Sequence, residues 1–196
     1  MSHQKGSPMA KSILKAFCFS AGLALSGLAA TTAYTLANPA VGGAAMLTSK
    51  NIVENALNSP IHKTLVAAVK AAGLVDTLES AGPFTVFAPT DSAFKKLPAG
   101  TVATLVKPEN KDKLTKILTA HVVAGKISAK DMMTKAKAMG GKYEMKTVSG
   151  DTLIAEVKKG ALYIVDESGG AAKVTVADVN QSNGVIHVVN KVLLPK

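Results

Sequence analysis

The chain has 196 residues and a formal net charge of +10 at pH 7, and its 23 Lys and Arg positions are all lysines. Arginine supplies the planar fork that grips phosphates and base edges, and tryptophan is absent as well, so we expect no nucleic-acid partner. The single cysteine, Cys18, lies close to the N-terminus. The rest of the chain therefore has no disulfide, thiolate nucleophile or sulfur-ligated zinc site.

The first 37 residues have the pattern of a signal peptide. Lysines without any acidic residue precede an apolar run, residues 16–30, which is short for a membrane span. Small residues follow, and we predict cleavage between residues 33 and 45. The alternative, an uncleaved membrane anchor, is disfavoured by the length of the run. The remaining chain would form one domain over residues 47–196, secreted or periplasmic, that meets a membrane only during export.

Apolar residues recur at helical spacing through the first half of this domain. The clearest pattern predicts a helix that carries His121 on its apolar stripe. Gly73 is placed to end an earlier helix, and Ser128 with Asp131 resembles a capping box. The predicted helices cover residues 51–57, 61–72, 111–123 and 128–137.

Between these helices, residues 84–88 have the pattern of a strand that ends at Pro89. Thr90 is placed to cap a short helix, and Asp91 would lie in its first turn, where the helix dipole favours negative charge. Phe94 would face inward from the same helix. We therefore interpret Thr90, Asp91 and Phe94 as structural residues.

From residue 142 the spacing of apolar residues changes to two, which is typical of strands. The last of these segments is apolar at nearly every position, so it should be central and covered on both faces. Helices followed by strands indicate an α+β fold class. Turn signals separate the predicted strands of a mostly antiparallel meander, which cover residues 143–147, 152–158, 161–165, 173–179 and 185–194.

Two segments carry a resemblance to a known family. Residues 85–94, TVFAPTDSAF, resemble the first signature of fasciclin domains, and residues 183–195, NGVIHVVNKVLLP, resemble the second. Residues 51–54 and 118–125 also fit. The resemblance implies a fasciclin-type wedge-shaped β-sandwich with flanking N-terminal helices. It also implies residence outside the cytoplasm and a role in adhesion or ligand binding.

The chain departs from the family pattern at two places. Animal adhesion members carry a Tyr-His pair where this chain has Ala120-His121, which weakens any carry-over of receptor binding to this position. The second signature usually has Asp where this chain has Asn190, and Asn can make most of the same hydrogen bonds. We interpret His187 and Asn190 as structural residues of this motif.

The histidines of the domain are the first candidate site residues. His62 follows Pro60 at a helix start and is expected to be exposed. His121 and His187 lie among apolar residues, so burial with structural hydrogen bonds is the favoured interpretation, and a partner contact through His121 is the alternative. We predict no metal site, because no second ligand stands at a suitable spacing. We predict no catalytic residue, because no set of acid, base and nucleophile is present.

Four methionines close together in the sequence are the second candidate, and the favoured interpretation is that they fill the core. One alternative is copper(I) capture, although a repeated pattern of methionines is missing. The other is a flexible apolar groove for a ligand, which the resemblance supports because some fasciclin-type proteins of algae and bacteria bind carotenoids. We expect no cofactor, with a carotenoid as the alternative. The four residues are Met132, Met133, Met139 and Met145.

Together these patterns predict an exported, non-enzymatic binding module for adhesion or matrix interaction at the cell envelope or outside the cell. Its partner would be an extracellular or envelope protein, a polysaccharide or a lipid. The alternative function is that of a carrier for an apolar small molecule such as a carotenoid or a lipid.

Overall fold

The computed structural model describes residues 38–196, and the predicted signal peptide, residues 1–37, lies outside them. The helices are α1 (Ile52–Asn58), α2 (Lys63–Ala72), α3 (Val75–Glu79), α4 (Asp91–Phe94), α5 (Thr101–Leu105), the 3-10 helix η1 (Pro108–Asn110), α6 (Lys111–Thr119) and α7 (Ala129–Ala138). The strands are β1 (Phe84–Pro89), β2 (Val122–Ala124), β3 (Lys142–Lys146), β4 (Thr152–Lys158), β5 (Ala161–Val165), β6 (Ala171–Gln181) and β7 (Gly184–Val189).

The strands of the described chain form one sheet in the order β2-β1-β7-β6-β5-β4-β3. Strands β3 to β7 pair consecutively and antiparallel, as the sequence predicts. Strand β7 is central and buried along its whole length. Its other neighbour, β1, runs parallel to it with Phe84 opposite Gly184, a pairing that the sequence did not predict. A Cβ atom at Gly184 would clash with the carbonyl oxygen of Phe84, which explains why the second signature has glycine there.

Strand β6 connects two parts of this sheet. Its first residues, Ala171 to Lys173, pair with β5, and its later residues pair with β7 through two irregularities of register. An isolated bridge joins Val123 of β2 to Thr147, which directly follows β3. The two edges of the sheet therefore approach each other, as in a sandwich, and the predicted α+β fold class is confirmed.

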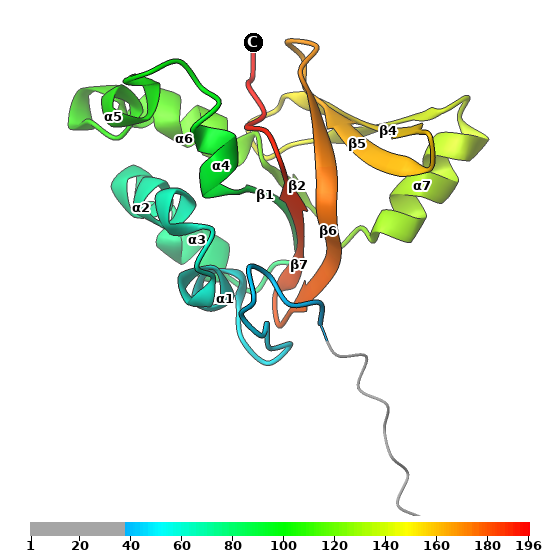
Figure 1. Ribbon diagram of the computed structural model, residues 1–196, viewed down its shortest axis with the longest axis horizontal. Helices are drawn as coiled ribbons and strands as arrows, with labels where there is room; N and C mark the ends of the chain where they lie inside the picture. The colour runs from blue at the N-terminus through cyan, green and yellow to red at the C-terminus, as the bar shows by residue number, and fades with distance from the viewer. Residues whose placement is uncertain (1–37) are drawn as a thin grey trace, which may run out of the picture. The chain divides into compact units, whose positions relative to one another are not determined.

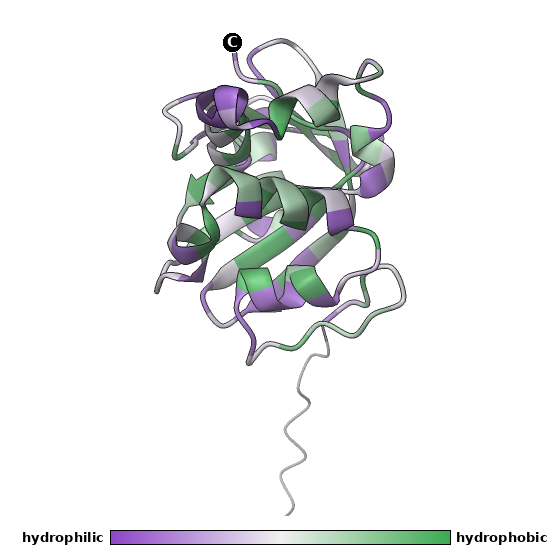
Figure 2. Ribbon diagram, turned by 90° about the vertical axis from the view of Figure 1, so that its left-hand side faces the viewer, coloured by the Kyte–Doolittle hydropathy of each residue, from purple (hydrophilic) through white to green (hydrophobic). Residues whose placement is uncertain are grey.

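The two faces of β1 and β7 pack into different cores. Helices α1 to α6 lie on one side of these strands and α7 lies on the other (Figure 1). Hydrophobic and hydrophilic residues alternate around the helices on the first side, so each helix can bury one stripe (Figure 2). Because side chains alternate along a strand, Val86 enters the core against these helices, whereas the next residue, Phe87, enters the core against the other strands and α7.

We name the two cores by their positions. The helix-side core contains Val41, Met46, Ile52, Val53, Leu65, Ala68, Val69, Ala72, Leu78, Val86, Ala88, Ala93, Phe94, Leu114, Leu118, Val122, Val179, Ile186, Val188 and Val192. The strand-side core contains Phe87, Val123, Ala129, Met132, Met145, Leu153, Ala155, Leu162, Ile164, Ala172, Val189 and Leu193.

Side-chain caps fix where several helices begin. The Thr90 hydroxyl accepts a hydrogen bond from the backbone N–H of Ala93 and so caps α4, from which Phe94 is buried in the helix-side core. Asp91 lies in the first turn of α4, as predicted, and its carboxylate also accepts the backbone N–H of Thr64 at 2.8 Å in the first turn of α2. Helix α7 begins with the predicted capping box of Ser128 and Asp131.

The helix predicted over residues 111–123 ends earlier than expected, at Thr119. Val122 and Val123 belong to β2 instead and pair with Val86 and Thr85 of β1. Apolar residues at helical spacing continue past the helix end because strand β2 is buried against the same core. His121 therefore lies in the turn between α6 and β2 and not on the helix.

The strand predicted over residues 185–194 also ends earlier, at Val189. Asn190 follows it and exchanges two hydrogen bonds with the backbone of Lys173: its side-chain oxygen accepts from the Lys173 N–H at 2.9 Å, and its own N–H donates to the Lys173 carbonyl. The amide supplies the oxygen that an aspartate would have supplied, without its charge.

The predicted domain begins at residue 47, but residues that precede it also pack on the fold. Asn38 exchanges side-chain hydrogen bonds with the backbone of Asn180, and Val41 and Met46 are buried in the helix-side core. A cleavage after Ala44 or Ala45, inside the predicted range, would remove Val41 from this core. In the described part of the chain, no helix has the length and apolar character needed to span a membrane.

Candidate functional site

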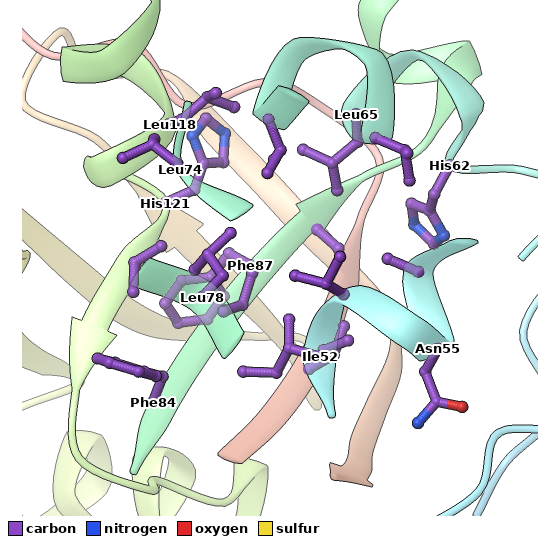
Figure 3. A pocket seen from close by; sticks show the side chains of 18 of the residues that line it. Ile52, Asn55, His62, Leu65, Leu74, Leu78, Phe84, Phe87, Leu118 and His121 are labelled. Atoms are coloured by element: carbon purple, nitrogen blue, oxygen red, sulfur yellow. The ribbon is translucent and has the colours of Figure 1, made fainter. Parts of the chain in front are cut away.

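The candidate site is a cavity in the helix-side core. Its volume is about 70 Å³, and its wall comes from α1, α2, α3 and α6 on one side and from β1, β6 and β7 on the other. Leu65, Leu78 and Leu118 are among the aliphatic side chains that face it (Figure 3). Two histidines, His62 and His121, lie on opposite sides of this group of side chains (Figure 3). The wall is otherwise almost entirely apolar, so the cavity is suited to an apolar occupant.

His121 uses both of its ring nitrogens in hydrogen bonds. Nδ1 lies 2.7 Å from the carbonyl oxygen of Ile117, and the backbone N–H of Leu193 donates to Nε2 at 2.9 Å. These partners place the proton on Nδ1, which donates to Ile117. Burial lowers the pKa of His121 to about 4, so the ring is neutral at pH 7. The ring ties the end of α6 to the chain after β7, and it has no nitrogen free for a partner.

His62 is buried, and the expectation that it is exposed was wrong. Only 3% of the residue is accessible. Its Nδ1 lies 2.8 Å from the hydroxyl of Ser59, three residues earlier in the turn between α1 and α2. Burial lowers the pKa of His62, and the backbone of Ala88 and the carboxylate of Asp91 act in the opposite direction. Nε2 is inaccessible, and among the buried side-chain nitrogens and oxygens of residues 38–196 it is the one without a well-formed hydrogen bond.

His187 lies away from the cavity, on the face of β7 that points to the strand-side core. Its ring stacks on Phe87 with the ring centres 5.7 Å apart. Nδ1 accepts the backbone N–H of Asp178, and Nε2 is 3.0 Å from the carbonyl oxygen of Ile127. Burial lowers the pKa of His187, so this ring is also neutral at pH 7. Both nitrogens hold backbone groups of neighbouring segments, which is a structural role.

The four candidate methionines do not form one site. Met132 and Met145 belong to the strand-side core, and Met133 is partly buried against it. Met139, which follows α7, is 61% exposed. The cavity wall contains none of them and is bordered by a different methionine, Met46.

Three polar residues position the cavity wall and were not predicted as site residues. Asn55 is fully buried and hydrogen-bonds the side chain of Gln181 and both backbone groups of Leu47. Asn183 accepts the N–H of Ile52 and donates to carbonyl oxygens at the end of α3. The third is His62, and the three-residue spacing from Ser59 was the signal in the sequence that could have indicated its burial.

The cavity wall offers no set of ligands for a metal ion. Across residues 38–196, no three side chains of the types His, Cys, Asp and Glu lie close enough together to hold one. The two histidines of the wall are separated by the apolar side chains between them (Figure 3). The arrangement can therefore hold an apolar group against an almost wholly apolar wall.

The fold and the two signature segments define an α+β domain of a known type. The profile of the Fasciclin domain matches residues 60–195, and the chain belongs to this family. Protein sll1483 of Synechocystis is 50% identical over 155 residues, which are 79% of this chain and 79% of that protein. The immunogenic protein MPB70 of Mycobacterium bovis is 34% identical over 169 residues, 83% of this chain and 78% of that protein.

A solved structure shows the same fold. The pair of FAS1 domains from the insect cell adhesion molecule Fasciclin I superposes with a TM-score of 0.67 at 20% identity. The superposition covers 74% of this chain and 51% of that chain, so this chain spans about half of the insect structure.

Proposed function

We propose that this chain is a non-enzymatic binding module that works outside the cytoplasm in adhesion or matrix interaction at the cell envelope. The observation that carries the proposal is the fasciclin domain itself, which fills residues 60–195. A relative that is 32% identical over 168 residues is described as a cell surface glycolipoprotein, and the structural neighbour is described as a cell adhesion molecule. The partner would be an extracellular or envelope protein, a polysaccharide or a lipid.

The charge of the domain supports an anionic partner among these classes. The chain carries 23 lysines, three of which precede the predicted cleavage region, so 20 lysines against 13 acidic residues give +7 for the rest. A surplus of this size attracts anionic polymers and headgroups through long-range electrostatics.

Gene deletion followed by complementation tests this function. We expect attachment of the host cells to a surface or to one another to fall on deletion and to return with the full chain. A chain that lacks residues 2–37 should not restore attachment, because it is not exported. N-terminal sequencing of the exported protein should find a start between residues 34 and 46. Unchanged attachment after deletion, or a leaderless chain that restores it, would contradict the proposal.

The cavity favours a second candidate function, the carriage of an apolar small molecule such as a lipid or a carotenoid. A concave, mostly apolar space is the usual form of a small-molecule site. Its volume of about 70 Å³ is far below the size of a whole carotenoid, so such a ligand would place only one end inside. Organic extraction and a visible spectrum of the protein purified from its host test this candidate. A colourless protein that releases no apolar molecule would argue against it.

A further inference from the structure

The surplus positive charge of the domain is concentrated in two segments. Residues 95–116 and 190–196 together carry eight lysines and two acidic residues, Glu109 and Asp112, which gives +6. The other residues of the described chain carry 12 lysines and 11 acidic residues, which gives +1. Within this remainder, residues 126–146 form a second, smaller basic region, in which six lysines against two acidic residues give +4.

The two segments with the largest surplus form one face of the molecule. Helices α4, α5 and α6 and the C-terminal end of the chain lie together in the upper part of Figure 1. Lys96 Nζ donates to the carbonyl oxygen of Asn190 at 2.9 Å. Lys116 Nζ donates to the carbonyl oxygen of Lys196 at 2.6 Å. All eight lysines of these segments are exposed, and we call them the basic face.

The protein leaves most of this charge without a counter-charge. Among residues 38–196 there are two ion pairs, and the one on the basic face joins Lys107 to Glu109 at 3.8 Å. The carbonyl oxygens that accept from Lys96 and Lys116 carry no net charge. Like charges held on one face repel each other, and an anionic partner relieves this repulsion. The basic face is therefore suited to a polyanion.

A hollow on this face indicates which kind of polyanion fits. Its volume is about 340 Å³, and it lies between the segment that leads into α5, α5 itself and the start of α6. Thr101, Thr104 and Asn110 line it together with Lys113. Hydroxyl and amide groups hydrogen-bond the hydroxyl groups of a sugar, and an ammonium group bonds an acidic group. The hollow therefore has the chemistry to hold one unit of an acidic sugar polymer.

A lipid bilayer fits this face less well. Binding in the membrane interface uses apolar side chains such as Trp, Phe and Leu, which enter the boundary between headgroups and acyl chains. Val106, at 37% exposure, is the one exposed large hydrophobic residue of the two segments. Neither segment contains an aromatic residue or an arginine, which also disfavours a nucleic acid.

We infer that the basic face binds an acidic polysaccharide, with its lysines on the acidic groups of the polymer and one sugar unit in the hollow. The inference rests on the proposed adhesive function and names its partner class and its surface. A contact between one exposed lysine and one acidic group is weak. A polymer that meets several lysines at once gains much more, because each further contact forms within a complex that already exists.

Polygalacturonate, a polymer of sugar acids, is the probe, and its methyl-esterified form is the uncharged control. Binding of the exported protein, purified from its host, is measured at low and at high salt. We expect binding to the acidic polymer, with an affinity that falls at least about tenfold between about 0.05 M and about 0.5 M salt, because ions screen exposed charges. No binding, or equal binding of the esterified polymer, would overturn the inference.

Two triple variants with the same change in net charge test the location. The face variant is Lys95→Gln, Lys113→Gln and Lys116→Gln. The control variant changes exposed lysines of the second basic region and is Lys130→Gln, Lys137→Gln and Lys142→Gln. The face variant should lose about tenfold or more in affinity for polygalacturonate, since three surface contacts are removed together, and the control less than about twofold. Equal losses would show that the overall charge alone attracts the polymer, which would overturn the inference.

Vesicles of phosphatidylcholine and phosphatidylglycerol provide the competing surface. Tighter binding to these vesicles than to polygalacturonate would make a membrane the partner and overturn the inference. The attachment assay separates the inference from the proposed function. If the face variant restores attachment to the deletion strain as fully as the parent chain, the adhesive function holds and the inference is overturned. If deletion leaves attachment unchanged while the purified protein binds polygalacturonate through the basic face, the adhesive function fails and the binding surface stands.

Discussion

The two cores of this domain are filled to different degrees. In the strand-side core, six of the twelve residues are completely inaccessible, whereas in the helix-side core Val179 alone among the twenty is. The cavity lies in the helix-side core. The same two strands, β1 and β7, contribute to both, so the difference comes from what packs against them.

The elements opposite the strands explain this difference. The strand-side core is closed by a continuous meander and by α7, a ten-residue helix with a capping box at its start. The helix-side core is closed by several separate helices, of which α2 has ten residues but α3 has five and α4 has four, and by the segment that precedes α1. Polar side chains such as Asn55 and Asn183 hold these pieces at fixed positions. Pieces held by hydrogen bonds cannot all move inward to fill the remaining space, and a cavity is left.

The largest expected loss of stability comes from truncating a buried methionine, and it tests whether the strand-side core is packed more densely than the helix-side core. Met132 is fully buried there, and Met132→Ala should lower the free energy of unfolding by about 4 kcal/mol. Met46 borders the cavity, so part of its surface already lacks partners, and Met46→Ala should cost about 2 kcal/mol. Chemical denaturation of both variants measures the difference. Equal losses would show that the two cores are packed alike.

His121 connects the two cores, and its role is tested by two substitutions. His121→Ala leaves the carbonyl of Ile117 and the N–H of Leu193 without partners, so we expect a loss of about 3 kcal/mol. His121→Gln keeps a donor and an acceptor and should recover part of this loss. Attachment of cells should be normal for both once they are folded. A His121→Ala protein that is as stable as the parent but does not support attachment would instead make His121 a partner-binding residue.

The buried histidines make the domain less stable in acid. His121 has its pKa lowered from 6.5 to about 4 by burial, and the pKa values of His62 and His187 are lowered as well. Between pH 6.5 and pH 4 the unfolded chain binds protons that the folded chain does not, so stability falls as the pH falls. His121 alone should contribute about 2–3 kcal/mol between pH 7 and pH 4.5. In His121→Gln, the free energy of unfolding should fall by about 2–3 kcal/mol less over this pH range than in the parent protein. An equal fall in both proteins would show that His121 does not cause the acid sensitivity.

The smallest expected effect comes from enlarging a valine to isoleucine, which should stabilise the helix-side core and destabilise the strand-side core. Val86 on β1 borders the cavity, so Val86→Ile should place its extra methylene there and stabilise the protein by up to about 0.8 kcal/mol. Val189 on the neighbouring β7 is fully buried in the strand-side core, and Val189→Ile should destabilise it by about 1 kcal/mol or more. Melting temperatures of the two variants give the signs. A destabilised Val86→Ile would show that the cavity does not accept the added group.

The sequence alone determined the features that depend on local chemistry. The two signature segments identified the family, the period-two pattern predicted the meander, and Ser128 with Asp131 predicted the start of α7. Gly73 ends α2 in the left-handed conformation that glycine adopts without strain. Each of these signals is complete within a few neighbouring residues, so it can be read without knowing the rest of the fold.

Only the tertiary structure decided the features that depend on contacts between distant segments. The parallel pairing of β1 with β7 brings residues about one hundred positions apart into register, and pairing with β1 turns Val122 and Val123 from an expected helix into a strand. His62 looked exposed because it follows Pro60 at a helix start, but it is buried and its ring contacts the Ser59 hydroxyl. Met139 shows the reverse, an apolar residue that remains exposed. Burial and cavities depend on which segments pack together, and that is fixed only when the whole chain is folded.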